Sequence, residues 1–316
     1  MLPSVRAFLS GIIDYAGLFP PAKLPLDQAI RNYAEYRAGS DAWMLGRFVV
    51  PVARLAELEA HAGLFQQGAP WVFSALGQGG DTLAEFVAGL DADLDAITAF
   101  QERHGERVVV DVIELRLPRW EKQTWTFWDL AEATGSFVTS PFLPGLTPVF
   151  ERPLSPDWRS SILSAINFAD QMRPTGFKLR CGGLEASAIP SPEQVALAIY
   201  YAIDCGVPLK FTAGLHHPIR HFNSGVQAKM HGFLNVFGAA VLARVRAFRL
   251  AEDQLREIIE DEDAAHFAFD ETGFRWKQYH VPTDTIVTAR RWFVLSFGSC
   301  SFDEPRDDLR AMGILS

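Results

Sequence analysis

Short runs of β-branched and aromatic residues alternate along the chain with longer segments of helical periodicity. The runs lie at residues 43–50, 71–77, 107–117, 146–151, 175–180, 208–214, 232–237 and 266–270. The helical patterns lie at residues 53–62, 82–103, 120–133, 157–172, 192–204 and 239–248. This alternation is typical of βα units and a parallel sheet. About eight such units predict a (β/α)8 barrel of the TIM type, and a doubly wound open parallel sheet is the alternative.

The two ends of the chain depart from this pattern. Residues 12–22, which include Asp14 and Tyr15, form a short irregular N-terminal segment that we expect to cross one end of the barrel. A hairpin after residue 270 and helices at residues 284–297 and 305–312 are expected at the C-terminal end. Composition shifts nowhere along the chain, so we expect residues 1–316 to form a single domain. Residues 137–139 are an alternative to the run that contains Val149 as the fourth strand of the predicted barrel.

Charged residues alternate with apolar residues in two of the predicted strands. In GFKLRC, Lys178 and Arg180 alternate with phenylalanine and leucine, and in PLKFTAG, Lys210 and Thr212 do the same. Successive side chains of a strand point to opposite faces, and barrel strands are covered by helices outside. We therefore expect the charged sets to point into the barrel, with Thr212 beside Lys210 in contact with substrate.

Further polar residues lie late in their predicted strands. These are Glu114, Glu151 and Asn235. Because an unpaired buried charge is costly, such groups must neutralise one another, reach water or meet a ligand. The carboxyl mouth of a barrel permits all three. Glu114 and Asn235, with Arg180, are therefore candidates for binding an anionic substrate, whereas structural ion pairs such as Glu151 with Lys178 are the alternative.

The strand lysines indicate one type of chemistry. A lysine that is partly desolvated among other cations has a depressed pKa, and its neutral amine can attack a carbonyl to form a Schiff base. Lys210 is the first candidate and Lys178 the second. The stretches KFTAG and KLRCGG resemble, in the opposite order, the strand-end lysine segments of class I aldolases such as deoxyribose-phosphate aldolase. This resemblance implies a lyase reaction.

The histidines of GLHHPIRHF suggest a second mechanism. His216 and His217, with Glu151, are candidates for proton transfer, because imidazole titrates near neutral pH. A helix starting at the proline would place His217 and His221 on one face. Together with Glu151 or Glu114 they would hold a divalent metal, as in a metal-dependent hydrolase or lyase. Capping or loop contacts are the alternative for these histidines.

Gly238 lies between a predicted strand and a predicted helix, near the position where barrels often bind phosphate, and is a further substrate-binding candidate. The sequence lacks GxSxG, GxxxxGK[ST] and GxGxxG, which argues against serine hydrolases, P-loop NTPases and simple dinucleotide folds.

Charge and composition limit the partners. The net charge of −9 and the absence of a basic run argue against nucleic-acid and anionic-membrane partners. No segment reaches the roughly 20 apolar residues of a membrane span, and no signal peptide is recognised. Three cysteines, an odd number, favour reduced thiols and a cytoplasmic location. A homo-oligomer is compatible with all of these features.

The preferred interpretation is a cytoplasmic barrel enzyme with lyase or aldolase-like carbonyl chemistry, which acts on a small anionic, oxygenated carbon compound. No cofactor is expected in that case. The metal-dependent enzyme is the second interpretation, and a non-catalytic barrel that binds a small anion is the third.

Overall fold

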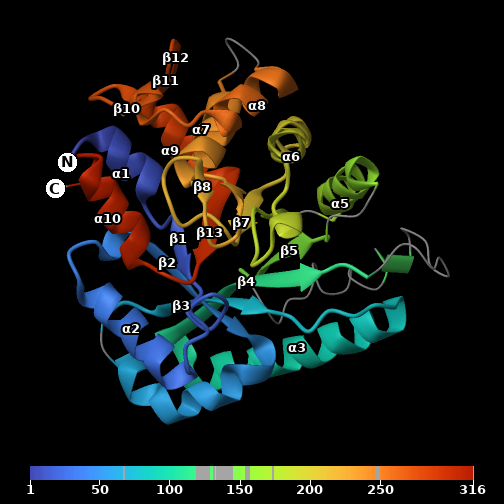
Figure 1. The fold of residues 1–316 in the computed structure, drawn as a ribbon. Coiled ribbons are helices and arrows are strands. Elements are labelled where there is room, and N and C mark those ends of the chain that lie inside the picture. Colours follow the sequence, from blue (N-terminus) through green and yellow to red (C-terminus); the bar gives the residue numbers. More distant parts are fainter. Residues whose placement is uncertain are drawn as a thin grey trace.

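A closed parallel barrel forms the centre of the computed structural model (Figure 1). The structure describes residues 1–66, 68–118, 129–130, 132, 145–153, 157–172, 174–245 and 250–315. The barrel strands are β1 Ile13–Tyr15, β2 Leu45–Pro51, β3 Trp71–Leu76, β4 Val108–Arg116, β5 Thr147–Glu151, β6 Gly176–Arg180, β7 Leu209–Thr212 and β13 Val294–Ser299. They follow the order β1–β13–β7–β6–β5–β4–β3–β2, and β2 pairs with β1 to close the ring. The predicted (β/α)8 barrel is confirmed, and the open sheet is wrong.

Helices cover the outside of the barrel, as Figure 1 shows for α3, α5 and α6. The α-helices are α1 Pro3–Leu9, α2 Leu26–Ala38, α3 Leu83–His104, α5 Trp158–Gln171, α6 Pro192–Cys205, α7 Phe233–Ala243, α8 Glu252–Glu260, α9 Thr283–Trp292 and α10 Asp303–Ala311. The 3-10 helices are η1 Ala42–Met44, η2 Val52–Gln66, η3 Gly105–Arg107, η5 Ala186–Ala188 and η6 Ala264–His266. None of the helices in the described ranges is long and apolar enough to cross a membrane.

Capping residues explain where two of the predicted helices begin. The side chain of Thr82 accepts a hydrogen bond from the backbone of Glu85, whose side chain bonds back to Thr82, and this capping box starts α3. Ser191 and Gln194 form the same arrangement at the start of α6. Gly206 then ends α6 in the left-handed conformation, at φ 71°, that glycine adopts without a steric penalty.

The predicted strand at residues 232–237 is wrong, because these residues start helix α7. Every residue from Phe233 to Leu242 is buried, so the segment shows no polar face that would reveal helical periodicity. A short run that is apolar on all sides cannot be assigned to helix or strand by its pattern alone. The predicted helix at residues 239–248 is the second half of α7, and residues 246–248 lie outside the described ranges.

The predicted barrel strand at residues 266–270 is also wrong. It contains β10 Phe267–Phe269, which pairs antiparallel with β11 Gly273–Trp276, and β11 pairs with β12 Tyr279–Pro282. The predicted hairpin is therefore confirmed, but it belongs to a separate three-stranded sheet.

The two barrel strands that the sequence pattern missed are β1 and β13. β1 has three residues and lies in the segment expected to be irregular. β13 follows α9 after a single residue, so its apolar residues continue the helical pattern and led to the prediction of one helix at 284–297. The predicted helix at 120–133, apart from residues 129, 130 and 132, and the competing strand at 137–139 lie outside the described residues.

The register of the barrel confirms the alternation of charged and apolar residues. Phe177 pairs with Leu209 and Lys178 pairs with Lys210 on the adjacent strands β6 and β7. All four side chains are buried. The two lysines therefore share one face of the sheet and point into the barrel.

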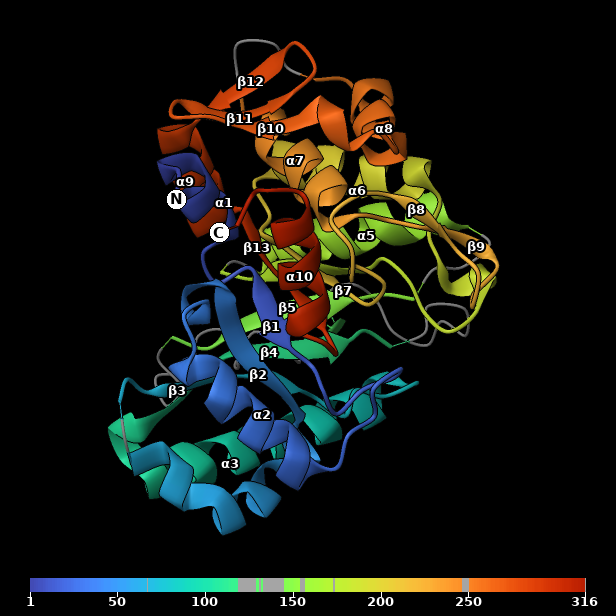
Figure 2. The ribbon, with the colours of Figure 1, turned by 60° about the vertical axis from the view of Figure 1, so that its left-hand side comes forward.

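Two further elements lie at the carboxyl end of the barrel strands. A small antiparallel hairpin of β8 His221–Asn223 and β9 Ala228–Met230 follows β7, and α10 follows β13. Figure 2 shows α10 packed in front of β1 and β13, with the hairpin extending to one side. These elements surround the site described next.

Candidate active site

Five charged side chains meet inside the barrel. They are Asp14, Glu114, Glu151, Lys178 and Lys210, each with at most 7% of its surface exposed. Lys178 Nζ lies 2.7 Å from Glu114 Oε2 and 2.5 Å from Glu151 Oε2. Lys210 Nζ is bonded to Asp14 Oδ2 and lies 3.5 Å from Glu114 Oε1. Each lysine is thus neutralised by two carboxylates.

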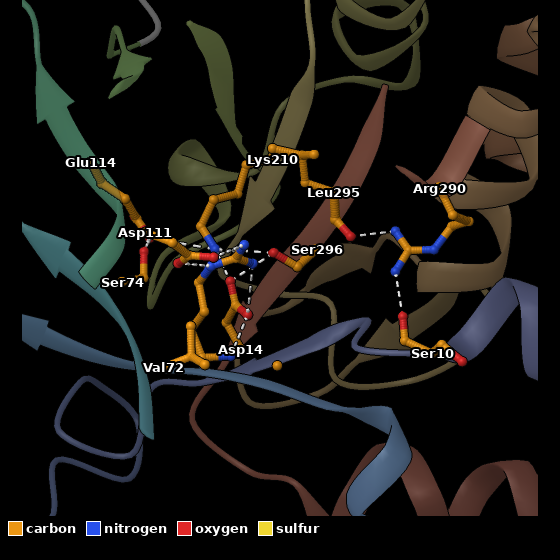
Figure 3. Close-up of polar contacts among 12 residues, drawn as sticks. Ser10, Asp14, Val72, Ser74, Asp111, Glu114, Lys210, Arg290, Leu295 and Ser296 are labelled. Atoms are coloured by element: carbon orange, nitrogen blue, oxygen red, sulfur yellow. Dashed lines mark hydrogen bonds and ion pairs between the residues drawn. The ribbon is translucent and has the colours of Figure 1, made fainter. Parts of the chain in front are cut away.

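Two serine hydroxyls complete this network, as Figure 3 shows. Ser74 donates a hydrogen bond of 2.7 Å to Glu114 Oε1, and Ser296 donates one of 2.6 Å to Asp14 Oδ2. Lys210 Nζ donates to Ser296 Oγ at 3.2 Å. Buried polar groups are stable only when their hydrogen bonds are made, and this network meets that requirement without a ligand.

The network holds its central groups in their charged forms. Burial alone would raise the pKa of Glu114, but Lys178 and Lys210 outweigh it and hold that pKa at about 2. Burial would likewise lower the pKa of Lys178, but Glu114 and Glu151 raise it above its usual value. The depressed pKa expected from neighbouring cations is therefore wrong for Lys178, because carboxylates are its nearest partners.

The sequence predicts that Lys178, Arg180 and Lys210 all point into the barrel, and the structure gives these three cations different surroundings. Glu151 forms the structural ion pair with Lys178 that was the alternative interpretation. Arg180 and Thr212 pair in register at the carboxyl ends of β6 and β7. The Arg180 side chain is 49% exposed, and its Nη1 lies 3.7 Å from Glu151 Oε1. Of the three cations, Arg180 is the one that reaches solvent.

A cavity of about 370 Å³ lies at the carboxyl ends of β1, β7 and β13. It is lined by Pro21, Ala22, Gly214, His216, His217, His221, Asn223, Met230, Cys300, Ser301 and Glu304. These residues come from the loops that follow the three strands, from the β8–β9 hairpin and from α10. Active sites of this fold lie at the same end of the barrel, so the cavity is the candidate active site.

Helix α10 holds two of the histidines that line the cavity. Nδ1 of His216 lies 2.9 Å from Glu304 Oε2, and Nδ1 of His217 lies 2.5 Å from Asp308 Oδ2. A carboxylate accepts the hydrogen bond from Nδ1–H, which fixes the tautomer and leaves Nε2 with its lone pair. Both imidazoles are therefore arranged to exchange a proton through Nε2.

His221 is the third histidine of the cavity. Its Nδ1 lies 3.2 Å from the backbone oxygen of Ile219, so Nδ1–H donates and Nε2 again carries the lone pair. In the described part of the chain, Nε2 is buried without a hydrogen-bond partner. Burial lowers the pKa of His221 below its usual value, so the ring is neutral at neutral pH.

The expected helix that carries both His217 and His221 is wrong. Residues 217–219 form a bend, and His221 starts strand β8. The bend nevertheless brings the two rings into edge-to-face contact, with 4.4 Å between their centres. A turn thus produces the proximity that we predicted from helical spacing.

The predicted cluster of histidines with Glu151 or Glu114 is not assembled. Both glutamates bind Lys178 inside the barrel, whereas His217 and His221 line the cavity at its end. Within the described ranges, no group of three or more His, Cys, Asp or Glu side chains is arranged to hold a metal ion.

Two predicted substrate-binding residues lie outside the barrel interior because they belong to α7. Asn235 accepts a hydrogen bond from the backbone of Arg220 and donates to the backbone oxygens of Ile258 and Asp261. It joins three segments of the chain, which is a structural role. A methyl group at Gly238 would meet the ring of Phe274 at 2.9 Å, so this glycine permits close packing within α7 and lies at no strand end.

Sequence reasoning missed several of the acidic partners. Asp14 was assigned to an irregular segment, although an acid within the run IIDYA is a signal that a buried cation lies nearby. Glu304 and Asp308 lie on α10, about 90 residues beyond the histidines that they bind. No local pattern indicates such a pairing.

Comparisons with known proteins identify no family. No protein-family model matches the sequence, and the search of curated proteins finds no significant match. The fold is similar to that of the tetrameric deoxyribose phosphate aldolase from Aeropyrum pernix, with 12% identity, a TM-score of 0.45 and coverage of 67% of this chain and 80% of that one. It is also similar to the endo-1,4-beta-xylanase XylE of Penicillium canescens, with 12% identity, a TM-score of 0.36 and coverage of 79% and 83%. Likeness at this level assigns no reaction, so the function has to be argued from the site.

Proposed function

We propose that this protein is an enzyme that moves protons on a small oxygenated substrate, with His216, His217 and His221 as the acid–base groups. One observation carries the proposal. Three imidazoles line one cavity at the carboxyl end of the barrel, and each has Nδ1 bonded to an oxygen acceptor. Their Nε2 atoms are the atoms left to react with a bound molecule.

His221 is suited to act as the general base. Because burial lowers its pKa, it is unprotonated at neutral pH and ready to accept a proton. A buried Nε2 without a partner among the described residues leaves an acceptor unsatisfied, and this cost is removed when a substrate O–H group donates a hydrogen bond to it.

His217 and His216 are suited to donate or hold the proton. The carboxylates of Asp308 and Glu304 stabilise the imidazolium that forms when each ring is protonated, as in other carboxylate–histidine pairs. A base and an acid in one cavity permit proton removal beside a carbonyl and protonation of the leaving oxygen or carbon. A lyase or isomerase reaction needs both steps.

The cavity suits a small substrate. Its volume of about 370 Å³ is at the low end of the range for small-molecule sites. Asn223 and Ser301 add hydrogen-bonding groups to its lining. Burial raises the pKa of the Cys300 thiol, so this residue is protonated at neutral pH and is a poor nucleophile.

Schiff-base chemistry at Lys210 or Lys178 is a second candidate, supported by the pairing of the two lysines inside the barrel. It needs a neutral amine and access to substrate, whereas the two side chains are buried in ion pairs and do not line the cavity that holds the histidines. A divalent metal bound by Nε2 of His217 and His221 is the metal-dependent alternative, supported by the contact between the two rings.

The experiment is a screen of small hydroxy and keto acids and their phosphates, with products detected by NMR. Single variants His216→Gln, His217→Gln and His221→Gln are compared with His61→Gln on η2, which lies outside the cavity lining. We expect a loss of kcat of about 10²-fold or more for the cavity histidines and unchanged activity for the control.

Three results would redirect the assignment. Full activity in the cavity variants would refute it. Borohydride trapping of substrate on Lys210 or Lys178 would favour the amine mechanism. Activity that requires an added divalent metal, and is lost in His217→Gln together with metal binding measured by calorimetry, would favour the metal-dependent enzyme.

A further inference from the structure

A second cavity lies at the opposite, amino end of the barrel. Its volume is about 350 Å³, and it is lined by Ser10, Gly11, Leu45, Gly46, Arg47, Val72, Arg290, Arg291 and Leu295. These residues precede β1, start β2, β3 and β13, or belong to α9. The cavity is therefore separated from the histidines by the length of the barrel. Figure 3 shows Arg290 and Ser10 on one side of this region and the Asp14–Lys210 network on the other.

Arg290 contributes a positive charge that forms no ion pair with the described residues. Its Nε donates to the backbone oxygen of Phe8 at 2.9 Å and its Nη2 to that of Ser10 at 3.0 Å, and its Nη1 bonds the carbonyls of Val294 and Leu295. Among the described residues, no carboxylate lies within ion-pair distance of it. Burial lowers the pKa of Arg290 to about 9, which still leaves the group charged at neutral pH.

Arg47 is the second guanidinium of this cavity, and two acidic side chains hold it in place. Its Nε and Nη2 bond both oxygens of Asp111, at 2.6 and 2.7 Å. Its Nη1 lies 3.7 Å from Asp14 Oδ1. This clamp fixes the orientation of the guanidinium, and the side chain remains 22% exposed. The third cation, Arg291, is exposed at the rim.

The cavity therefore presents three guanidinium groups, and no acidic side chain belongs to its lining as described. The nearby acids Asp14 and Asp111 pair with Arg47, and Asp14 also partly opposes the lowering of the Arg290 pKa by burial. A cation beside a cavity that forms no ion pair is stabilised by an anion, and the planar guanidinium can bind two oxygens of a carboxylate or phosphate at once.

We infer that this amino-end cavity binds a small oxyanion, a phosphate or carboxylate group, between Arg290, Arg47 and Arg291. Gly11 leaves room for it, because a Cβ built at this position meets no atom within 4 Å. The site shares no residue with the histidine cavity. Anion binding at this site can therefore be tested separately from the proposed reaction. Arg47 also binds Asp14. An anion bound to Arg47 is therefore linked to the charge network inside the barrel through the Arg47 side chain.

Gly11 offers a test that changes the charge of the cavity and leaves Arg290 in place. Its backbone is left-handed, at φ 56°, and a Cβ built on it meets no atom within 4 Å. Asparagine and aspartate are the residues other than glycine that tolerate this conformation best. Gly11→Asn and Gly11→Asp therefore differ in charge at the same position with almost the same shape.

The measurement is isothermal titration of the full-length protein with inorganic phosphate and, separately, with malonate, in a chloride buffer of constant ionic strength. We expect saturable binding of at least one of them to the wild type. Binding should be at least about tenfold weaker in Gly11→Asp than in Gly11→Asn, weaker in Arg291→Ala, and unchanged in His61→Gln, whose side chain lines neither cavity. Tighter binding of phosphate than of malonate would identify a phosphate ligand, and the reverse a carboxylate.

Two outcomes would overturn the inference. One is the absence of saturable binding of either anion to the wild type. The other is equal affinity in Gly11→Asn and Gly11→Asp, which would place the bound anion elsewhere. Circular dichroism and thermal unfolding of both variants establish that they are folded, so that a loss of binding in Gly11→Asp alone reports on charge.

Discussion

Replacing Glu114 with glutamine is the sharpest test of the charge balance inside the barrel. Glu114 lies between both lysines, 2.7 Å from Lys178 Nζ and 3.5 Å from Lys210 Nζ. Glutamine keeps the size of the side chain and removes its charge. Each lysine then retains one acidic partner, Glu151 or Asp14, and the network inside the barrel loses one negative charge.

The pKa of Glu114 gives the size of the effect. Burial would raise this pKa, but the two ammonium groups hold it at about 2 in the folded protein, whereas a free glutamate has a pKa of about 4.3. At about 1.4 kcal/mol for each pKa unit, the ionised form stabilises the fold by about 3 kcal/mol at neutral pH. Breaking a buried ion pair by removing one partner costs a similar 3–5 kcal/mol or so.

The sign of the pH dependence follows from the lowered pKa. The stabilisation is complete above the pKa of the unfolded chain and is lost as pH falls through the folded value of about 2. We therefore expect Glu114→Gln to lower the free energy of unfolding by about 3 kcal/mol at pH 7 and by about half as much near pH 3.

Urea unfolding followed by circular dichroism measures this difference at both pH values. Glu262→Gln is the control, because Glu262 forms an exposed pair with Lys229 and should change stability by about 1 kcal/mol or less. The reasoning is refuted if Glu114→Gln lies within about 0.5 kcal/mol of the wild type at pH 7, or if the difference is the same at pH 3.

Four variants and one pH titration test other parts of the structure. Burial lowers the pKa of His221, so the activity of the wild type should fall on the acid side only below pH 6.5 or so. His221→Gln should remove this activity. A variant with the pH–rate profile of the wild type would contradict the role of His221 as base. Asn235→Ala should cost about 2–4 kcal/mol in urea unfolding by leaving buried backbone groups unpaired, and a cost below about 1 kcal/mol would contradict its joining role. Gly238→Leu should destabilise by about 3 kcal/mol or prevent folding, since even a Cβ lies 2.9 Å from Phe274; a soluble variant with the melting temperature of the wild type would show that the packing can relax. Because the pKa of Lys178 is raised in the folded protein, its charged form stabilises the fold fully below the unfolded value of about 10.4. Stability should therefore decline as pH rises beyond that value. In thermal unfolding at alkaline pH, Lys178→Met should lose less stability with rising pH than the wild type.

The parts of the site that could be predicted depend on local periodicity. Lys178 and Lys210 alternate with apolar residues that must face the helices, so their inward direction follows from the two-residue repeat of a strand. The closeness of His217 and His221 follows from their short separation in sequence, although a bend and not a helix produces it.

The parts that could not be predicted depend on contacts between distant segments. Asp14 and Ser296 come from β1 and β13, which are too short, or too close to a helix, to show a pattern of their own. Glu304 and Asp308 reach the histidines only because α10 packs over the barrel end. Lys178 has a raised pKa for the same reason, since its carboxylate partners come from other strands.

The pairing of β1 with β13 has a consequence for the order of folding during synthesis. Asp14 pairs in register with Gly298, and Ser296 of the same strand lies 282 residues after Asp14, so the ring joins β1 to a strand that is synthesised much later. Contacts between residues so far apart in sequence form slowly, because a long loop must be ordered first. Until β13 has been made, β1 lacks one neighbour and Lys210 lacks the Ser296 hydroxyl. The nascent chain therefore has to keep an unfinished, charge-lined sheet from aggregating until β13 emerges.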